Sequence, residues 1–259
     1  MLLEVHGITK KFVLNFWENR KITAVDQVSF ELEAGECLGV IGESGCGKST
    51  LGRMICGLIP CDSGNILFQG EKLGKKTKKK ELRRQMQMVF QYPQQAFNPK
   101  EKLIHAVREP IRNFQLASSE MEEKTLISEM IDSVGVTWDQ LERYPHEISG
   151  GQAQRLAIAR SLVMNPQLLI ADEVTSMLDV SVQAQILNIL VREQKKRNLG
   201  MLFVSHDLEV IRAICDKVMV MKNGKILEQG KTEKVFGNPQ SDFTKYLLKS
   251  YINPELFTT

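Results

Sequence analysis

The chain has 259 residues, enough to bury a sizeable core as one large domain or two small ones. Its hydrophobic fraction of 42% and charged fraction of 25% are those of an ordinary globular protein, and a net charge of +3 is too small to indicate a nucleic-acid partner. The five cysteines form no C-x-x-C pair, which favours reduced cytosolic thiols over a disulfide framework or a zinc site.

The N-terminus and the apolar runs bear on membrane insertion. Glu4 and His6 lie where a signal peptide needs an apolar stretch. No segment approaches the roughly 18 consecutive apolar residues of a membrane-spanning helix. We therefore expect a soluble, cytoplasmic chain that reaches a membrane only through a partner.

Strand and helix patterns alternate along most of the chain. Asn223-Gly224 lies between two apolar runs and predicts a β-hairpin within 217–229. The alternation indicates a mostly parallel sheet with helical cover, which a helical stretch at about 100–160 interrupts as a candidate subdomain. The other predicted elements are strands within 22–41 broken at Ala34-Gly35, a helix over 51–58, a strand over 64–69, a solvated basic loop or helix start at 75–80, a strand over 86–91, helices within 119–134 and 152–163, a strand over 168–171, a helix over 180–197, a strand over 201–205 and a helix over 207–214.

The residues GESGCGKST at 42–50 fit the phosphate-loop pattern G-x-x-x-x-G-K-[ST] between a strand and a helix. Gly42 and Gly47 let the backbone wrap around a phosphate, so that N–H groups and the helix N-terminus face the anion. Lys48 is expected to reach the β- and γ-phosphates, and Ser49 to ligate Mg²⁺. By itself the motif indicates a phosphate-binding NTPase or kinase. The remaining loop residues expected at the nucleotide are Ser44, Gly45, Cys46 and Thr50.

An acidic pair ends a second apolar strand, LLIADE at 168–173. Such a strand delivers Asp172 to the sheet edge, where phosphate-loop enzymes place the aspartate associated with Mg²⁺. Glu173 is then placed to accept a proton from an attacking water as a general base. For this sequence taken alone, a surface acidic pair that caps a helix is the alternative.

The residues ISGGQ at 148–152 open a predicted helix. A serine such as Ser149 before a helix is typical of an N-cap. A serine hydroxyl and the bare N–H groups of Gly150 and Gly151, followed by Gln152, also make a phosphate site at a helix N-terminus. A second phosphate site, distant from the first, implies that ATP is sandwiched between two chains.

The order of these motifs, completed by Gln91, SMLD at 176–179 and SHD at 205–207, resembles that of ABC-transporter ATPases over nearly the whole chain. The resemblance implies a single ABC ATPase domain with an α/β fold: a P-loop NTPase (RecA-like) core with a mostly parallel sheet, an antiparallel β subdomain and a helical subdomain. The implied boundaries are about 1–91 and 164–235 for the core and β subdomain, 92–163 for the helical subdomain and 236–259 for a C-terminal helical tail.

The resemblance also implies a head-to-tail dimer, in which the Ser149 segment completes the ATP site of the partner chain. Gln91 matches the loop glutamine that senses Mg²⁺ and contacts the membrane subunits. His206 matches the switch histidine that holds the γ-phosphate, and Asp179 matches the dimer-contact aspartate.

Three further details concern single positions. We choose Phe12 as the aromatic residue that stacks on adenine, with Phe16 and Trp17 as rivals in an inserted loop, because stacking needs only a π-face. Val174 stands where the family usually has proline, which bears on loop stiffness and leaves the catalytic groups intact. Cys46 is open to oxidation if the helix N-terminus favours its thiolate, and is otherwise a small residue that faces its neighbours.

The segments 89–100, 108–110 and 178–187 look like the oligopeptide, dipeptide and nickel importer branch. The resemblance implies an ATP-hydrolysing subunit on the cytoplasmic face of the membrane, with ATP and Mg²⁺ as cofactors. The implied partners are two transmembrane permease subunits, a second and non-identical ATPase subunit and, indirectly, an extracellular substrate-binding protein, with no nucleic acid. The absence of a C-terminal cysteine cluster points slightly toward nickel-type or metallophore-type cargo.

Other functions remain open at this point. A soluble ABC protein acting on nucleic acid or ribosomes typically carries two cassettes or a long coiled-coil insertion, and this sequence shows neither. A P-loop kinase would not need ISGGQ. An exporter commonly fuses the cassette to membrane helices, which are absent from the sequence.

Overall fold

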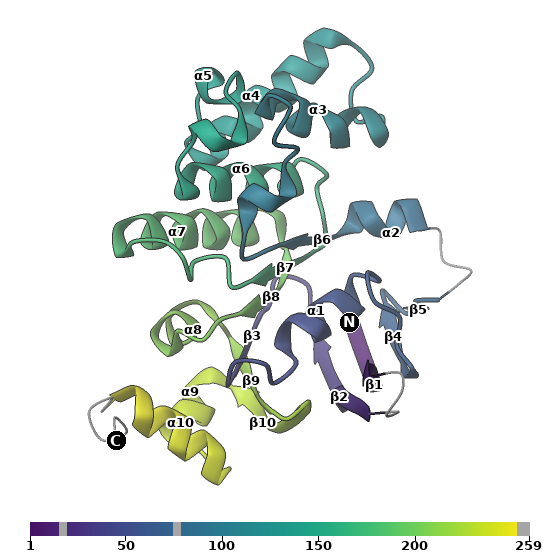
Figure 1. The fold of residues 1–259 in the computed structure, drawn as a ribbon, viewed down its shortest axis with the longest axis vertical. Helices are drawn as coiled ribbons and strands as arrows, with labels where there is room; N and C mark the ends of the chain where they lie inside the picture. Colours follow the sequence, from purple (N-terminus) through teal and green to yellow (C-terminus); the bar gives the residue numbers. More distant parts are fainter. Residues whose placement is uncertain (16–19, 75–78, 253–259) are drawn as a thin grey trace. The chain divides into compact units, whose positions relative to one another are not determined.

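The computed structural model describes residues 1–15, 20–74 and 79–252 (Figure 1). The chain divides into two units: unit 1 joins Met1–Thr77 to Gly200–Thr259, and unit 2 is Lys78–Leu199. A separate helical subdomain at 92–163 stays a prediction, because this division keeps those residues together with two strands and two helices that flank them. Within the described ranges no helix combines the length and the apolar composition needed to cross a membrane.

Unit 1 contains a four-stranded sheet in the order β2-β1-β4-β5, and Figure 1 shows β1, β2 and β4 side by side. The strand β1 is not among the predicted elements. Its first residues alternate with a two-residue period, since Leu3 and Val5 are buried whereas Glu4 and His6 are not. The strands are β1 (Leu3–Asn15), β2 (Arg20–Leu32), β4 (Ser63–Phe68) and β5 (Glu71–Lys72), and every pairing among them is antiparallel.

The inserted loop expected at Phe16 and Trp17 is flanked by two paired strands. The segments on either side form the far ends of β1 and β2, where Phe12 pairs with Ile22 and Val13 with Lys21. Several register shifts along this pair hide the alternation from a sequence pattern. Residues 16–19, which include the rival adenine-stacking candidates Phe16 and Trp17, lie outside the described residues.

A second set of strands in unit 1 has the order β10-β9-β3-β8. Strand β3 (Cys37–Gly42) is parallel to both β8 (Gly200–Val204) and β9 (Lys217–Lys222). Every residue of β3 and β8 is buried, as in strands covered on both faces. The predicted hairpin is confirmed: β10 (Lys225–Lys231) pairs antiparallel with β9. The helices of unit 1 are α1 (Lys48–Ile55), α8 (Leu208–Ile214), α9 (Thr232–Gly237) and α10 (Asp242–Ile252).

Unit 2 contains two parallel strands and most of the helices. Strand β6 (Met86–Val89) pairs with β7 (Leu168–Asp172), which is buried throughout. Side chains set where the longest helices begin, since Ser119, Ser149 and Asp179 each accept a backbone N–H at an N-terminus. The helices are α2 (Lys79–Gln85), α3 (Leu103–Asn113), α4 (Glu120–Val134), α5 (Trp138–Leu141), α6 (Gly150–Leu162) and α7 (Val180–Arg197), with 3₁₀ turns at Pro93–Ala96 and Pro145–Glu147.

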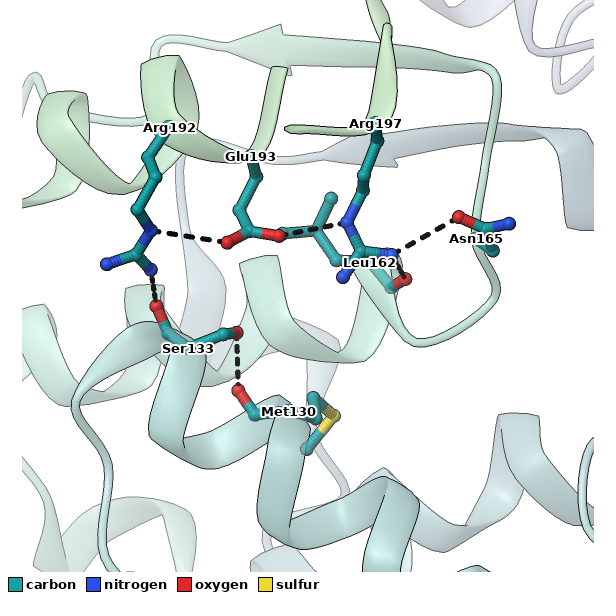
Figure 2. A network of polar contacts seen from close by, with 7 residues as sticks. All are labelled: Met130, Ser133, Leu162, Asn165, Arg192, Glu193 and Arg197. Carbon is teal, nitrogen blue, oxygen red and sulfur yellow. Dashed lines mark hydrogen bonds and ion pairs between the residues drawn. The ribbon is translucent and has the colours of Figure 1, made fainter. Parts of the chain in front are cut away.

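A buried carboxylate joins three helices of unit 2 (Figure 2). Glu193 of α7, only 1% exposed, contacts Arg192 Nε at 3.3 Å and Arg197 Nε at 2.9 Å with its two oxygens. Arg197 also donates to the carbonyl oxygen of Leu162, the last residue of α6, at 3.1 Å. Arg192 donates to the carbonyl oxygen of Ser133 in α4. The two guanidinium groups thus give this carboxylate, which is buried away from water, its ion-pair partners.

Candidate functional site

The phosphate loop joins β3 to α1 in unit 1, and its tightest point is Gly47. The φ of Gly47 is +113°, and a Cβ added there would lie 2.0 Å from the carbonyl oxygen of Ala24 in β2. Only glycine therefore allows this approach. The turn of the β9–β10 hairpin supports the same loop, because Gly224 N donates to the carbonyl oxygen of Cys46 at 2.9 Å.

Lys48 is the buried charge of this loop, with 5% exposure. Its ammonium donates to the carbonyl oxygens of Gly42 and Glu43, at 2.8 and 2.9 Å. An ammonium has three N–H donors, so these two bonds fix its position within the loop. The lysine charge is thus held where the sequence motif predicts a phosphate.

The other loop residues differ in exposure. Ser44 and Gly45 are exposed, whereas Ser49 and Thr50 are half-buried in the first turn of α1. Cys46 is buried, and this burial raises the pKa of its thiol, with only partial compensation by the Lys48 ammonium. The thiolate is therefore disfavoured, so the helix N-terminus does not activate Cys46 for oxidation.

Two more candidates belong to unit 1. His206 is exposed in the turn between β8 and α8. The next residue, Asp207, is the N-cap of α8, and its Oδ1 accepts from Glu209 N at 3.0 Å. Phe12 lies on β1 with 38% exposure, and the Lys10 ammonium is 5.6 Å from its ring centroid. The face of the Phe12 ring is thus near the Lys10 cation. Stacking of Phe12 on adenine stays a prediction.

In unit 2 the acidic pair follows β7. Asp172 ends the strand with 4% exposure. Glu173 has a φ of +50°, a conformation that non-glycine residues rarely adopt and that marks functional sites when the surroundings hold it. Gln91, from the segment after β6, donates its Nε2 to Glu173 Oε2 at 2.8 Å. The structure thus brings together two predicted site residues that are 82 positions apart.

Ser176, the first residue of the SMLD motif, is a third member of this cluster, although the sequence analysis assigns it no role of its own. Its Oγ lies 3.0 Å from the carbonyl oxygen of Glu173 and 3.2 Å from Gln91 Nε2. Its place three residues after Glu173 is compatible with a turn. Nothing in the sequence pattern indicates the contact with Gln91.

The segment at 149–152 begins α6. Ser149 is exposed and is the N-cap: its Oγ accepts from Gln152 N at 3.3 Å, while Ser149 N donates to Gln152 Oε1 at 3.0 Å. The N-cap interpretation is therefore confirmed. Gly150 is exposed, but a Cβ on Gly151 would lie 2.6 Å from Val182 Cγ1 of α7. The second glycine thus permits close packing of α6 on α7, and the phosphate role of the segment stays a prediction.

Asp179 begins α7 as its N-cap. Its Oδ1 accepts from Val182 N at 2.9 Å, and the residue is exposed. This local bond satisfies one of the unpaired N–H groups of the helix N-terminus. The dimer contact implied by the family resemblance would be additional to it.

Each unit carries one predicted Mg²⁺ ligand. The Ser49 hydroxyl at the start of α1 and the Asp172 carboxylate at the end of β7 are of the oxygen type that this hard cation prefers, and a site shared by the two stays a prediction. Among the residues that the structure describes, no group of three or more His, Cys, Asp or Glu side chains forms a dedicated metal cage. A cation with one or two protein ligands, completed by water and phosphate oxygens, is the usual form of Mg²⁺ at a nucleotide.

Curated proteins with similar sequences are transport ATP-binding proteins. OppF of Bacillus subtilis (strain 168), an oligopeptide transport ATP-binding protein, is 40% identical over 98% of this chain and 83% of its own length. OppF of Streptococcus pyogenes serotype M1 is 44% identical over 95% of this chain and 81% of its own. The dipeptide transport ATP-binding protein DppF of Haemophilus influenzae is 43% identical over 96% and 77%.

Solved structures agree with this likeness. The dimeric ATP-binding cassette MJ0796, bound to ADP and Pi after hydrolysis, superposes with a TM-score of 0.79 at 25% identity, covering 89% of this chain and 99% of the cassette. CbiO1 from Clostridium perfringens, part of an ABC transporter complex, gives 0.78 at 26% identity and covers 98% and 95%. The predicted fold class, an α/β P-loop NTPase, is thereby confirmed.

The family described as ABC transporter matches residues 25–176, more than half of the chain. The match begins within β2 and runs past the phosphate loop, Gln91, the Ser149 segment and Glu173. The chain therefore belongs to the ABC transporter family and is one of its ATP-binding, ATP-hydrolysing subunits.

Proposed function

We propose that this ATPase powers the uptake of oligopeptides or dipeptides. The observation that carries the proposal is the similarity, at 40–44% identity over at least 95% of the chain, to proteins named for oligopeptide and dipeptide transport. The names of these relatives support peptides as the cargo in preference to nickel. In this proposal the chain lies on the cytoplasmic face of the membrane, bound to two permease subunits and a second ATPase, and an extracellular binding protein delivers the peptide.

The nucleotide contacts follow from the geometry of each unit. Lys48, already held by loop carbonyls, binds the β- and γ-phosphates, and the exposed His206 holds the γ-phosphate. The exposed Ser149 and Gly150 offer a hydroxyl and a helix N-terminus to the nucleotide bound by a partner cassette. The dimeric state of the similar cassette MJ0796 supports this arrangement.

Hydrolysis needs a base and compensation of negative charge. Glu173 accepts the proton of the attacking water, and the Gln91 amide holds the carboxylate in place. Ser49 and Asp172 would hold Mg²⁺, which when bound offsets charge on the phosphate oxygens. ADP and phosphate are the products, and loss of the γ-phosphate contacts releases the partner cassette.

The test is uptake of labelled peptide and of labelled nickel by cells that carry either the native chain or Glu173→Gln. We expect peptide uptake to be lost, while the purified variant still binds ATP and hydrolyses it on the order of 10²- to 10³-fold more slowly, the scale of general-base catalysis. The exposed Glu142→Gln is the matched control and should behave as the native chain.

Other outcomes contradict separate parts of the proposal. Selective loss of nickel uptake would replace the peptide with a metal cargo. Unchanged uptake of both solutes would remove both cargo assignments. Near-native ATP hydrolysis by Glu173→Gln would show that another group is the base.

A further inference from the structure

Ser176 occupies a position between the two groups that the proposed mechanism uses. Its Oγ is within hydrogen-bond distance of both the Glu173 carbonyl oxygen, at 3.0 Å, and Gln91 Nε2, at 3.2 Å. Gln91 Nε2 in turn lies 2.8 Å from Glu173 Oε2. Ser176 is half-buried, so water competes only partly for these bonds.

The direction of each hydrogen bond in this cluster is determined by chemistry. A carbonyl oxygen only accepts, so the single hydrogen of the Ser176 hydroxyl is donated to the Glu173 carbonyl. The Ser176 oxygen must then accept from Gln91, which requires that the amide presents its Nε2 on this side. The ionised Glu173 carboxylate also only accepts, and it imposes the same orientation.

Both N–H groups of the Gln91 amide are therefore used within the cluster. The amide Oε1 is turned away from Glu173, because a carbonyl dipole facing the carboxylate would repel it. An amide that lost the Ser176 acceptor would keep only one of the two contacts that define its rotation about χ3, a torsion with a broad and shallow energy profile.

The same hydroxyl supports the backbone of the base. The Glu173 carbonyl accepts from Ser176 N at 3.2 Å as well as from Ser176 Oγ, so two donors of one residue hold the turn that begins at Glu173. A non-glycine residue at a φ of +50° persists only when its surroundings stabilise that conformation. Ser176 contributes two of the bonds that do so.

We propose that Ser176 is a positioning residue for ATP hydrolysis, which orients the Gln91 amide and thereby the Glu173 carboxylate. The inference rests on the proposed role of Glu173 as the base. Ser176 acts on the base through the Gln91 amide and through the backbone of Glu173.

The test is a double-mutant cycle on the full chain, with Ser176→Ala, Gln91→Ala and the two combined, assayed for steady-state ATP hydrolysis with Mg²⁺. We expect Ser176→Ala to lower kcat about tenfold, a loss of orientation, while KM for ATP changes less than about twofold. In the Gln91→Ala background the same substitution should lower kcat by clearly less than tenfold, because only the Ser176 bond to the Glu173 carbonyl is then left to lose.

A conservative variant and a stability measurement separate positioning from folding. Ser176→Thr keeps the hydroxyl and should retain at least about half of the native kcat. Thermal unfolding of each variant checks that the native fold is present, and the kcat comparison uses only temperatures below the transition. If Ser176 is purely structural, Ser176→Ala will lower the amount of active protein by the same factor with and without Gln91. That result would overturn the inference.

Different outcomes overturn the role of Ser176 and the role of Glu173. If Ser176→Ala keeps native kcat while Glu173→Gln abolishes hydrolysis, Ser176 is not a positioning residue and Glu173 remains the base. If Glu173→Gln also hydrolyses ATP normally, the proposed base is wrong and the inference falls with it.

Discussion

The phosphate loop of unit 1 and the acidic loop of unit 2 are shaped by different kinds of contact. The phosphate loop is shaped by its main chain: Gly47 approaches the Ala24 carbonyl more closely than any Cβ allows, and Gly224 N bonds the Cys46 carbonyl. The acidic loop is shaped by side chains, with Glu173 held by the Gln91 amide and the Ser176 hydroxyl. The first kind of loop requires glycine at a given position, whereas the second requires polar partners from distant parts of the sequence.

This difference explains how readily each loop can be predicted from the sequence. A main-chain constraint appears directly as a glycine at a fixed spacing, so the phosphate-loop motif is strong by itself. A side-chain constraint between residues 82 positions apart leaves no local pattern. By itself, the acidic pair is therefore compatible with either a catalytic site or the cap of a helix. The phosphate loop and the family resemblance favour the catalytic site.

The largest effect is expected when the main-chain contact is broken. Gly47→Ala would place a Cβ 2.0 Å from the Ala24 oxygen, so the loop must move. We expect a loss of about 3 kcal/mol or more in the free energy of unfolding and at least about 100-fold weaker ATP binding, measured by denaturant titration and by fluorescent-nucleotide binding.

Gly45→Ala is the matched control, because Gly45 also has a positive φ, +77°, but nothing lies within 4 Å of an added Cβ. It should cost only the conformational penalty of about 1–2 kcal/mol. Equal losses in the two variants would show that φ alone, and not the approach to β2, shapes the phosphate loop.

A smaller but substantial loss is expected when a buried side-chain network of unit 2 is broken. Glu193→Ala removes the carboxylate between Arg192 and Arg197, and leaves Arg197, 23% exposed, without its ion pair. We expect a loss of about 2–4 kcal/mol in the free energy of unfolding, read from denaturant titration.

The exposed pair of Lys102 and Glu142 provides the comparison within the same unit. Because both side chains are well solvated, Glu142→Ala should leave the unfolding midpoint unchanged within error. A Glu193→Ala variant as stable as Glu142→Ala would mean that the buried network contributes no more to the stability of unit 2 than an exposed ion pair does.

The smallest effect concerns the end of the acidic loop. Asp179→Ala removes the side-chain acceptor for Val182 N at the start of α7 and should cost about 1 kcal/mol in the free energy of unfolding. Asp179→Asn keeps an acceptor and should cost a few tenths at most. If both variants were native-like, the cap would not define where the acidic loop ends.

Much of the fold was predictable because its elements carry local signals. The helix Val180–Arg197 has the predicted bounds, since Asp179 caps its start and a left-handed Asn198, at a φ of +51°, ends it. The hairpin at Asn223-Gly224 is equally local. Strand β1 was missed because its register against β2 shifts several times, which disrupts the regular alternation toward Phe12.

The candidate site was predictable in its residues and not in its contacts. The motifs identify Lys48, Glu173 and Gln91, but the carbonyl partners of Lys48 and the bond from Gln91 to Glu173 depend on tertiary structure. At Gly151 the motif predicts a ligand contact, but the structure also shows a second reason for glycine. A side chain there would collide with Val182.

The two hydrogen bonds of the Lys48 ammonium have a consequence for affinity. A flexible lysine loses up to about 2 kcal/mol of rotamer entropy when it becomes immobile. Here that loss is part of folding, because carbonyl groups of the loop itself, at Gly42 and Glu43, hold the ammonium. In the proposed role of Lys48, ATP therefore binds to a preorganised cation. Because the side-chain entropy of Lys48 is lost on folding and not on binding, the affinity for ATP gains up to about 30-fold without an additional contact.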